Sequence, residues 1–184
     1  YRPRVHTWQV ISNEPGSFRR KTLRSYADYL LWHVILPKYL SAGDGAKALE
    51  VGSAPGEQLV RLARSFGLIP YGVEYSPSGA ELNRRVFSKA GFDPANVIEA
   101  DFLSPGFQDR YKEFFDVVMS RGFIEHFDDA ENVVAKHVNV LAPGGTLIVT
   151  VPNLRGCNYL LQQLFDADLI GIHNLEIMRK ERFV

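Results

Sequence analysis

One stretch of the sequence constrains the fold more than any other, because it has the pattern of a buried strand, a tight turn and a helix in direct succession. The apolar run Ala46–Val51 ends in a β-branched residue, which is typical of a buried parallel strand. Residues 52–56 (GSAPG) have the small residues and proline of a turn, and apolar residues recur at helical spacing from Glu57 onward. A glycine-rich turn between a buried strand and a helix N-terminus allows a ligand to lie against bare backbone.

The glycine spacing and the preceding acidic residue indicate which kind of ligand this turn suits. Gly52 and Gly56 are four positions apart with Ala54 between them, whereas a dinucleotide-binding turn needs Gly-x-Gly-x-x-Gly. Glu50 stands just before the turn. Its carboxylate would repel a pyrophosphate but would attract an ammonium group. The pattern therefore favours S-adenosylmethionine, which carries an ammonium and a sulfonium and no phosphate, over NAD.

The segment Glu-x-Gly-x-Ala-x-Gly resembles the first motif of class I S-adenosylmethionine-dependent methyltransferases, usually written acidic-x-Gly-x-Gly-x-Gly, with Ala54 in place of the middle glycine. The resemblance implies an α/β fold, a Rossmann-like doubly wound and mostly parallel sheet with helices on both faces. It implies the cofactor S-adenosyl-L-methionine and the product S-adenosyl-L-homocysteine. The alternative is an ordinary β–α turn in an unrelated α/β protein. The implied cofactor-binding residues of this turn are Glu50, Gly52, Ser53, Ala54 and Gly56.

Composition bounds the class of protein without naming its activity. The 184 residues suit a single domain, 46% of them are hydrophobic, and the formal net charge is +0. Nucleic acid is not a favoured partner, because no basic excess is present. The longest apolar run, Tyr29–Leu36, is too short to cross a bilayer and contains His33. We therefore expect no membrane span.

Cysteine usage is consistent with a reducing compartment, and we expect a cytoplasmic location. Cys157 is the only cysteine, so an internal disulfide and a cysteine-rich metal site are both excluded, and we predict no metal site. The sequence begins at Tyr1, so an original targeting segment cannot be read from it.

The chain is predicted to be one methyltransferase-like domain, 1–184, in three parts. Residues 1–40 are an N-terminal arm and a helix, 46–153 are the cofactor-binding core, and 154–184 are a substrate-side segment. The helix is expected over Thr22–Leu40, with Pro37 disturbing its last turn. Its predicted apolar face is Leu23, Tyr26, Ala27, Leu30, Leu31, Val34 and Ile35.

The second strand is expected over Tyr71–Tyr75, followed by Ser76 as a helix N-cap and Pro77 at the first helical position. An acidic residue about 20 positions past the glycine turn is the expected ribose ligand in nucleoside-binding folds. Glu74 matches that position in the methyltransferase pattern, and Tyr75 follows it in the predicted cofactor site. The alternative for Glu74 is a charge at a strand end that faces solvent.

The third strand is expected over Asn96–Ala100, and the residues after it resemble the adenine-binding motif of the family. The resemblance implies that Asp101 accepts a hydrogen bond from the adenine amino group. The backbone amide of Phe102 would complete the pocket. The alternative is a loop aspartate that caps a turn.

The fourth strand, Phe114–Ser120, leads into a loop with Glu125 and His126 that resembles the fourth motif of small-molecule methyltransferases. Backbone carbonyls of Ser120, Arg121 and Gly122 would accept from the cofactor ammonium. His126 is the candidate catalytic base, and its alternative role is to bond the loop backbone. Asp116, at the start of the strand, is predicted to be structural.

The remaining pattern completes the core and then weakens. Asp128 and Asp129 are expected at a helix N-terminus, and the face of that helix is Val133, Val134, His137, Val138 and Leu141. Residues 141–145 (LAPGG) resemble the family turn that feeds a fifth strand, Thr146–Val151.

The last part of the chain has little motif content. Leu154–Ala167 is expected to be helical, and His173–Glu176 is a candidate loop over the active site. A class I domain normally adds an antiparallel hairpin of two strands, and too few residues follow Glu176 for both, so we expect the given residues to lack this hairpin. We therefore expect a continuation of the chain or a partner to cover the exposed sheet edge.

The motifs together predict an S-adenosylmethionine-dependent methyltransferase that transfers a methyl group to oxygen, nitrogen or carbon of a small molecule. An RNA methyltransferase is one alternative, because Gly-x-Ala-Pro-Gly resembles a 2′-O-ribose family, although Ser120-Arg121 stand where that family has its catalytic aspartate. A catalytically silent cofactor-binding or scaffold domain is another. A nicotinamide oxidoreductase fits least, since the glycine spacing is wrong. The sequence defines neither the acceptor nor the oligomeric state.

Overall fold

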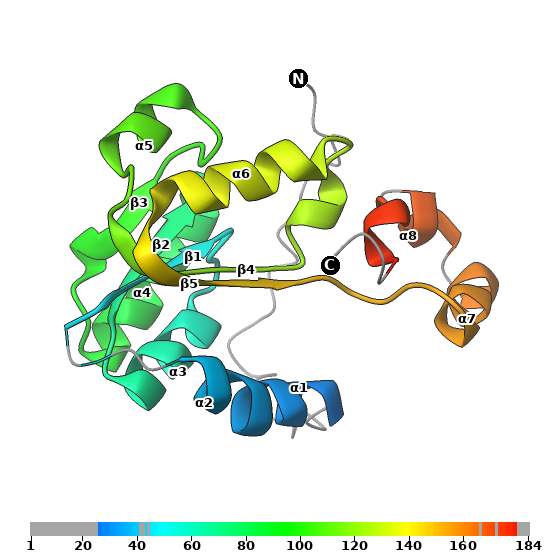
Figure 1. Ribbon diagram of the computed structural model, residues 1–184, viewed down its shortest axis with the longest axis horizontal. Helices are drawn as coiled ribbons and strands as arrows, with labels where there is room; N and C mark the ends of the chain where they lie inside the picture. Colours follow the sequence, from blue (N-terminus) through cyan, green and yellow to red (C-terminus); the bar gives the residue numbers. More distant parts are fainter. Residues whose placement is uncertain (1–25, 41–42, 44, 166, 172, 180–184) are drawn as a thin grey trace. The chain divides into compact units, whose positions relative to one another are not determined.

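The structure is a computed structural model that describes residues 26–40, 43, 45–165, 167–171 and 173–179. The chain divides into two compact units, one ending at Ser41 and the other beginning at Ala42. In the second unit the described residues form one five-stranded parallel sheet with the order β3-β2-β1-β4-β5 (Figure 1). The strands are β1 (Lys47–Val51), β2 (Ile69–Glu74), β3 (Val97–Glu99), β4 (Phe115–Arg121) and β5 (Leu141–Thr150).

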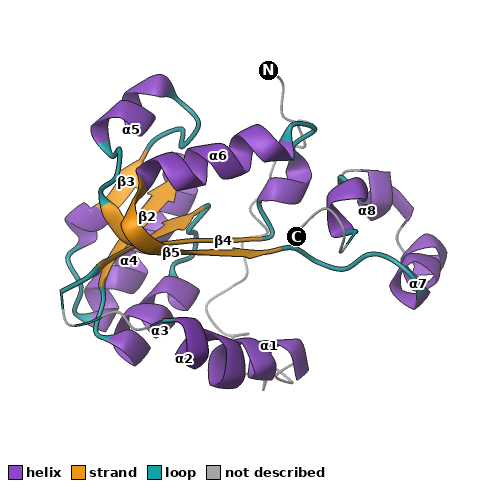
Figure 2. Ribbon diagram, viewed as in Figure 1, coloured by secondary structure: helices purple, strands orange, loops and turns teal. Residues whose placement is uncertain are grey.

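Helices cover both faces of this sheet, as Figure 2 shows. The helices α3 (Glu57–Phe66) and α4 (Pro77–Ala90) lie on one face, and α5 (Pro105–Arg110) and α6 (Ala130–Val140) lie on the other. The predicted Rossmann-like, doubly wound arrangement is therefore confirmed. Short 3-10 turns, η2 (Pro94–Asn96) and η3 (Ile124–His126), lie in the connections.

Local capping explains why two of these helices begin where the sequence predicts. The Ser76 hydroxyl accepts from the Gly79 N–H at the start of α4, and Pro77 occupies the first helical position. The Asp129 carboxylate accepts from the Asn132 N–H at the start of α6. The predicted N-cap at Ser76 is confirmed, and so is the predicted helix start at Asp128 and Asp129.

A core cluster fills the space between the sheet and the α5–α6 layer. It is aromatic-rich, and its buried members are Leu49, Val51, Val73, Phe102, Phe107, Phe115, Val118 and Val140. In α6 the buried side chains are Ala130, Val133, His137 and Val140, whereas Val138 is 53% exposed. The prediction that Val138 faces the core is wrong, because this row of residues at positions i, i+3, i+7 and i+10 leaves Val138 on the opposite side of the helix.

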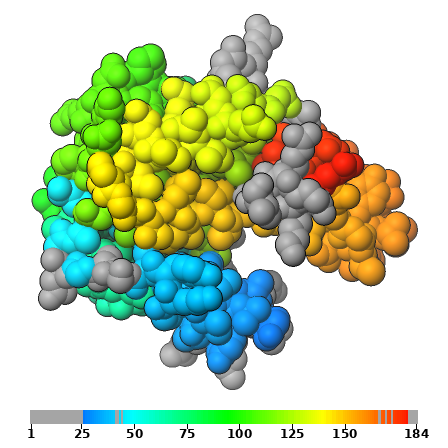
Figure 3. Space-filling model, in the orientation of Figure 1, coloured from blue at the N-terminus to red at the C-terminus, as the bar shows by residue number. Residues whose placement is uncertain are grey.

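The predicted Pro-Gly-Gly turn is part of β5 in the structure. Leu141 pairs with Phe115, and the next pairing is Thr146 with Val117, so the register is interrupted between them. A Cβ at Gly145 would lie 2.7 Å from the Asp116 carbonyl oxygen. The two strands therefore approach too closely for any residue but glycine at this irregularity. Figure 3 shows the α6 and β5 segments (yellow and gold) side by side on the surface of this unit.

The first unit is a helix with a wide turn in its middle. The segments are α1 (Tyr26–Leu30), the π-helical η1 (Leu31–Ile35) and α2 (Leu36–Tyr39), and residues 1–25 of the predicted arm and helix lie outside the described residues. Its predicted apolar face is wrong in part. Tyr26, Val34 and Ile35 are exposed, and Trp32, Leu36 and Leu40 are buried. The π turn has more residues per turn than an α-helix, so it shifts the residues after it around the helix axis relative to an uninterrupted α-helix.

The last described residues form α7 (Cys157–Phe165), α8 (Ala167–Gly171) and the 3-10 turn η4 (Glu176–Met178). The predicted helix over Leu154–Ala167 is confirmed over Cys157–Phe165. The antiparallel hairpin typical of the family is not among the described strands. Within the described part of the chain, every helix is too short or too polar to cross a membrane.

Candidate functional site

The candidate site lies at the carboxyl edge of the sheet, where the strand order reverses between β1 and β4. From β1 the chain continues to β2 and β3 on one side, and β4 and β5 lie on the other. Open α/β sheets bind ligands at such a switch point. The connections at this point are residues 52–56 after β1 and residues 122–126 after β4.

The glycine turn after β1 is held by backbone bonds and by close packing on α4. The amides of Gly52 and Ser53 both donate to the Val73 carbonyl, at 3.0 and 3.2 Å. Gly56 has φ +98° and is the N-cap of α3. A Cβ at Gly56 would collide with Oδ1 of Asn83, a fully buried α4 side chain. The glycines of the predicted motif are thus required by the backbone path as well as by any ligand.

Asn83 and Gly72 also support this turn, and neither was predicted from the sequence. The Asn83 amide donates to the Ser53 hydroxyl, and both side chains are buried. A Cβ at Gly72 would lie 2.5 Å from Ser53 Oγ and 2.6 Å from Asn83 Nδ2. A glycine inside a strand is the available signal for such a close approach. Asn83 has no comparable signal, because its partner lies 30 positions away.

Glu50 is buried at the end of β1, with only 5% of its surface exposed. Burial raises the pKa of its carboxyl to about 8, while the positive charge of Arg121 and a bond from the Leu59 backbone act in the opposite direction. Its Oε2 atom has no hydrogen-bond partner among the described residues, and the same holds for Oγ of the fully buried Ser120. Because Glu50 pairs with Met119, the residue before Ser120, the two unpartnered oxygens lie on opposite faces of the sheet.

Strand register places Glu50 and Glu74 on one face of the sheet. Glu50 pairs with Gly72, and Glu74 follows Gly72 by two residues, so both carboxylates point to the α3–α4 side. Glu50 also pairs with Met119 in β4, which places Arg121 on the same side. Glu50 and Glu74 therefore share a face at the carboxyl edge of the sheet.

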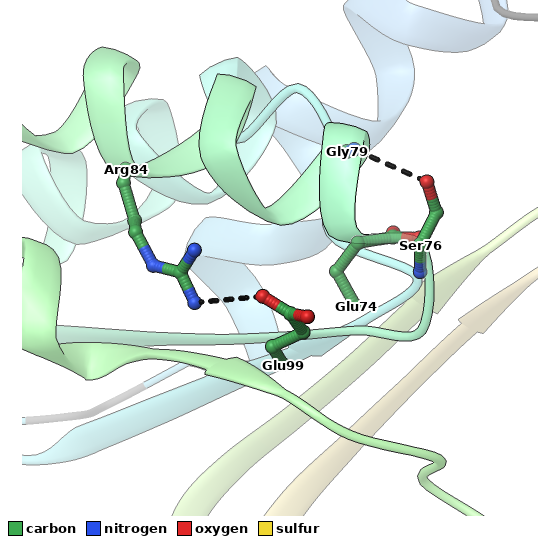
Figure 4. A network of polar contacts seen from close by, with 5 residues as sticks. All are labelled: Glu74, Ser76, Gly79, Arg84 and Glu99. Atoms are coloured by element: carbon green, nitrogen blue, oxygen red, sulfur yellow. Dashed lines mark hydrogen bonds and ion pairs between the residues drawn. The ribbon is translucent and has the colours of Figure 1, made fainter.

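The Glu74 carboxylate joins the glycine turn to the start of α4. It accepts from the Ser76 N–H at 3.0 Å and from the Ala54 N–H at 3.3 Å. Figure 4 shows Glu74 beneath the first turn of α4, beside the Ser76–Gly79 cap. Each carboxylate oxygen can accept a further bond, so the ribose role stays a prediction. The Tyr75 side chain is 77% exposed.

The loop after β3 has the turn-capping contact that was the alternative for Asp101. Its Oδ1 atom accepts from the Leu103 N–H at 2.8 Å, and its carbonyl accepts from Ser104. The adenine contact stays a prediction for this carboxylate. Phe102 is buried with its ring 4.8 Å from that of His137. Arg84 of α4 pairs with Glu99 of β3 just before this loop, at 3.3 Å (Figure 4).

His137 is a fully buried imidazole beneath this region. Its Nδ1 atom lies 2.7 Å from the Val133 carbonyl, which can only accept, so Nδ1 carries the hydrogen. Burial lowers the pKa of the ring, and the Val133 carbonyl opposes this effect. The neutral ring packs against Phe102 and Phe123 as an aromatic core residue.

The turn after β4 contains a second buried carboxylate. Gly122 has φ +63° and its amide donates to the Thr150 carbonyl at 2.9 Å. Glu125 is 1% exposed, and burial raises the pKa of its carboxyl, opposed by its own backbone amide and by the charge of His173. Its Oε2 atom has no hydrogen-bond partner among the described residues.

The segment 173–176 lies against this turn, and its role as a loop over the active site stays a prediction. The Asn174 N–H donates to the Glu125 carbonyl at 2.7 Å, and the Asn174 side chain donates to the Phe127 carbonyl at 3.1 Å. The rings of His126 and His173 have centroids 4.9 Å apart. Sequence patterns did not group these histidines, because 47 positions separate them. Asp116, at the opposite edge, accepts from the Lys47 N–H at 2.8 Å and is structural, as predicted.

Comparison with known protein families matches residues 49–149 to a methyltransferase domain. The chain belongs to this methyltransferase domain family. The match spans the glycine turn, all three acidic positions at the strand ends and most of β5. It confirms the predicted resemblance to class I S-adenosylmethionine-dependent enzymes, and the cofactor of this family is S-adenosylmethionine.

Two curated relatives differ in the acceptor that their names state. The chain is 28% identical to EEF1A lysine methyltransferase 2 of Danio rerio over 131 residues. This alignment covers 67% of this chain and 53% of the relative. Over 113 residues it is 26% identical to aklanonic acid methyltransferase DauC of a Streptomyces species, which covers 60% and 50%. The chain thus spans about half the length of the curated relatives it matches.

Solved structures share the fold. A geranyl diphosphate C-methyltransferase from Streptomyces coelicolor, solved with S-adenosyl-L-homocysteine, superposes with a TM-score of 0.52 at 22% identity, covering 62% of this chain and 43% of that one. The [4+2]-cyclase SpnF superposes equally well, with a TM-score of 0.52 at 19% identity, and covers 62% and 42%. At these identities the similarity concerns the fold alone.

Proposed function

We propose that this chain binds S-adenosylmethionine at the β1–β4 switch point and transfers its methyl group to an acceptor. The observation that carries the proposal is Glu50, a buried carboxylate with an unpartnered oxygen directly before the glycine turn. A buried carboxylate needs a cationic or donor partner. The cofactor has an ammonium group and a sulfonium centre, so the chemistry of this position fits it.

The other predicted contacts divide the cofactor among the strand ends. Glu74 would accept from the ribose hydroxyls, Asp101 from the adenine amine, and the carbonyls of residues 120–122 from the ammonium. The strand register supports the last of these, because Ser120 pairs with Val51 at the end of β1, next to the glycine turn. The open backbone of residues 52–56 would lie against the nucleoside.

The catalytic task of the chain is then mainly positioning. The bound cofactor supplies a methyl group already activated by the positive sulfur. The chain holds the acceptor in line with that group and excludes water. A base is needed only when the acceptor arrives protonated, and His126 is the candidate predicted from sequence.

For the acceptor we propose a small molecule, reacting at oxygen, nitrogen or carbon. The Glu-His loop after β4 and the absence of a basic excess support this choice, and the similarity to aklanonic acid methyltransferase agrees with it. A lysine side chain of a protein is the second candidate, supported by the similarity to EEF1A lysine methyltransferase 2. The two candidates predict acceptors of very different size.

Calorimetry with S-adenosylmethionine, S-adenosylhomocysteine and NAD⁺ tests the cofactor assignment. We expect binding of the first two and none of NAD⁺, and failure of both to bind a folded sample would contradict the proposal. Transfer of a labelled methyl group into a small-molecule panel, compared with transfer into protein lysines, tests the acceptor class. Tight binding without transfer would instead indicate a silent domain, and steep salt-dependent RNA binding an RNA methyltransferase.

A further inference from the structure

The turn after β4 and the segment that covers it bring together three side chains of the kind that bind metal ions. They are Glu125 and His126 from η3 and His173 from the residues after α8. We propose that these three side chains bind one divalent transition-metal ion. The proposal concerns binding and is independent of whether the chain transfers methyl groups.

The distances within the cluster are close to those that a single ion requires. One ligand atom from each residue lies within 4.8 Å of the others. Two atoms bound to one ion at about 2.0–2.2 Å each can be at most about 4.4 Å apart. Small side-chain rotations would therefore bring all three atoms into contact with an ion, without a change in backbone.

The backbone around the cluster is already fixed by hydrogen bonds on both sides. Asn174, next to His173, bonds the carbonyls of Glu125 and Phe127. These bonds hold the segment after α8 on the η3 turn, so His173 is placed next to His126 by the fold and not by its own side chain. A metal site with ligands from distant segments needs this support.

Glu125 gives an independent observation that points to a ligand at this position. Its side chain is 1% exposed, and its Oε2 atom has no hydrogen-bond partner among the described residues. Leaving a buried carboxylate oxygen without a partner is costly. The Oε1 atom lies 3.4 Å from the position of a Cβ at Gly122, so the carboxylate sits tightly against the turn. A cation beside His126 would satisfy the orphaned oxygen.

The ligand types indicate which ions fit. Two imidazoles and one carboxylate suit Zn²⁺, Co²⁺, Fe²⁺ or Mn²⁺, whereas Mg²⁺ and Ca²⁺ prefer all-oxygen sites. Three protein ligands leave positions open for water or an acceptor molecule. While the ion is bound, His126 is one of its ligands. It then cannot also act as the catalytic base that the sequence suggests.

Titration of the full chain with Co²⁺ after chelator treatment tests the proposal directly. The visible absorption of Co²⁺ reports which atoms surround the ion. If these residues had a purely structural role, adding Co²⁺ would not produce the absorption of a protein-bound ion. We expect one Co²⁺ per chain, displaced by Zn²⁺, with affinity lowered by more than about tenfold in His173→Ala and in Glu125→Gln. The matched control is His33→Ala, an exposed histidine of the first unit, which should leave the affinity unchanged.

Two results would overturn the site. One is the absence of Co²⁺ and Zn²⁺ binding to the chelator-treated chain, and the other is equal affinity in His173→Ala and the unmodified chain. Thermal unfolding confirms that each variant is folded, and Glu125→Gln provides the second test if His173→Ala is not. S-adenosylmethionine binding is measured on the same samples. If the cofactor binds and the metal ion does not, the metal proposal is wrong while the proposed function stands.

Discussion

The turns after β1 and after β4 lie at the same edge of the sheet, and each has a buried glutamate, but they are built differently. The turn at residues 52–56 is defined by its own glycines and by neighbours on β2 and α4. The turn at residues 122–126 is completed by Asn174 and His173, which come from beyond α8. The first turn is local and recognisable from a short motif, and the second exists only after the chain has folded.

The two buried glutamates differ in the neighbouring groups that offset the free-energy cost of burying their charge. Arg121 and the Leu59 backbone lie near Glu50, and His173 lies near Glu125. Each also retains an oxygen without a hydrogen-bond partner among the described residues. We infer that the first position is suited to an organic cation and the second to a metal ion.

The largest expected effect concerns Glu50 and the pH dependence of folding. Its pKa is about 8 in the folded chain against a usual 4.5, so the folded state holds the proton more tightly. The contribution of this proton to the free energy of unfolding is fully present below pH 4.5. It is lost as the pH rises toward 8, by up to about 1.4 kcal/mol per pH unit. Glu50→Gln should flatten this decline and be more stable than the unmodified chain at pH 9, by up to about 5 kcal/mol.

Urea unfolding of both chains between pH 5 and pH 9 measures this difference. The control is Glu81→Gln, which changes an exposed glutamate paired with Arg85 and should keep the decline. Parallel pH profiles for Glu50→Gln and the unmodified chain would show that Glu50 is not the buried group that titrates.

The next effect tests whether the turn after β1 depends on close packing. Gly56 and Gly91 both have positive φ, at +98° and +81°, but only a Cβ at Gly56 meets a neighbour, Asn83. Gly91→Ala should cost about 1 kcal/mol for its backbone conformation alone. Gly56→Ala should cost about 3 kcal/mol, because overpacking against Asn83 is added. Urea midpoints of the two variants give the comparison, and equal losses would contradict the packing argument.

The smallest effect tests the long-range contact at the turn after β4. Asn174→Ala removes the side-chain bond to the Phe127 carbonyl and keeps the backbone bond to Glu125. We expect a loss of about 1 kcal/mol in stability and a weaker Co²⁺ affinity, with S-adenosylmethionine binding unchanged. Asn158→Ala is a matched control, since it removes a similar side-chain bond, to the Asn153 carbonyl, outside the cluster. The account would be wrong if both variants bound Co²⁺ equally.

The parts that could be predicted from sequence are those encoded by neighbouring residues. Short-range rules predicted the approximate positions of the strands, the glycine turn, the N-cap at Ser76 and the start of α6, because each depends on residues within a few positions. The burial pattern around η1 could not be predicted, since a π turn changes the helical phase without a clear sequence signal. The His126–His173 contact could not be predicted either, because tertiary packing alone creates it.

We infer that Glu50, which is mostly protonated at pH 7 in the free chain, loses its proton and meets the cationic cofactor as a carboxylate. Calorimetry of S-adenosylmethionine binding at pH 7, in two buffers of different ionisation enthalpy, counts the protons released. The account predicts release of about one proton more by the unmodified chain than by Glu50→Gln. Equal proton release by the two chains, with binding intact in both, would contradict it.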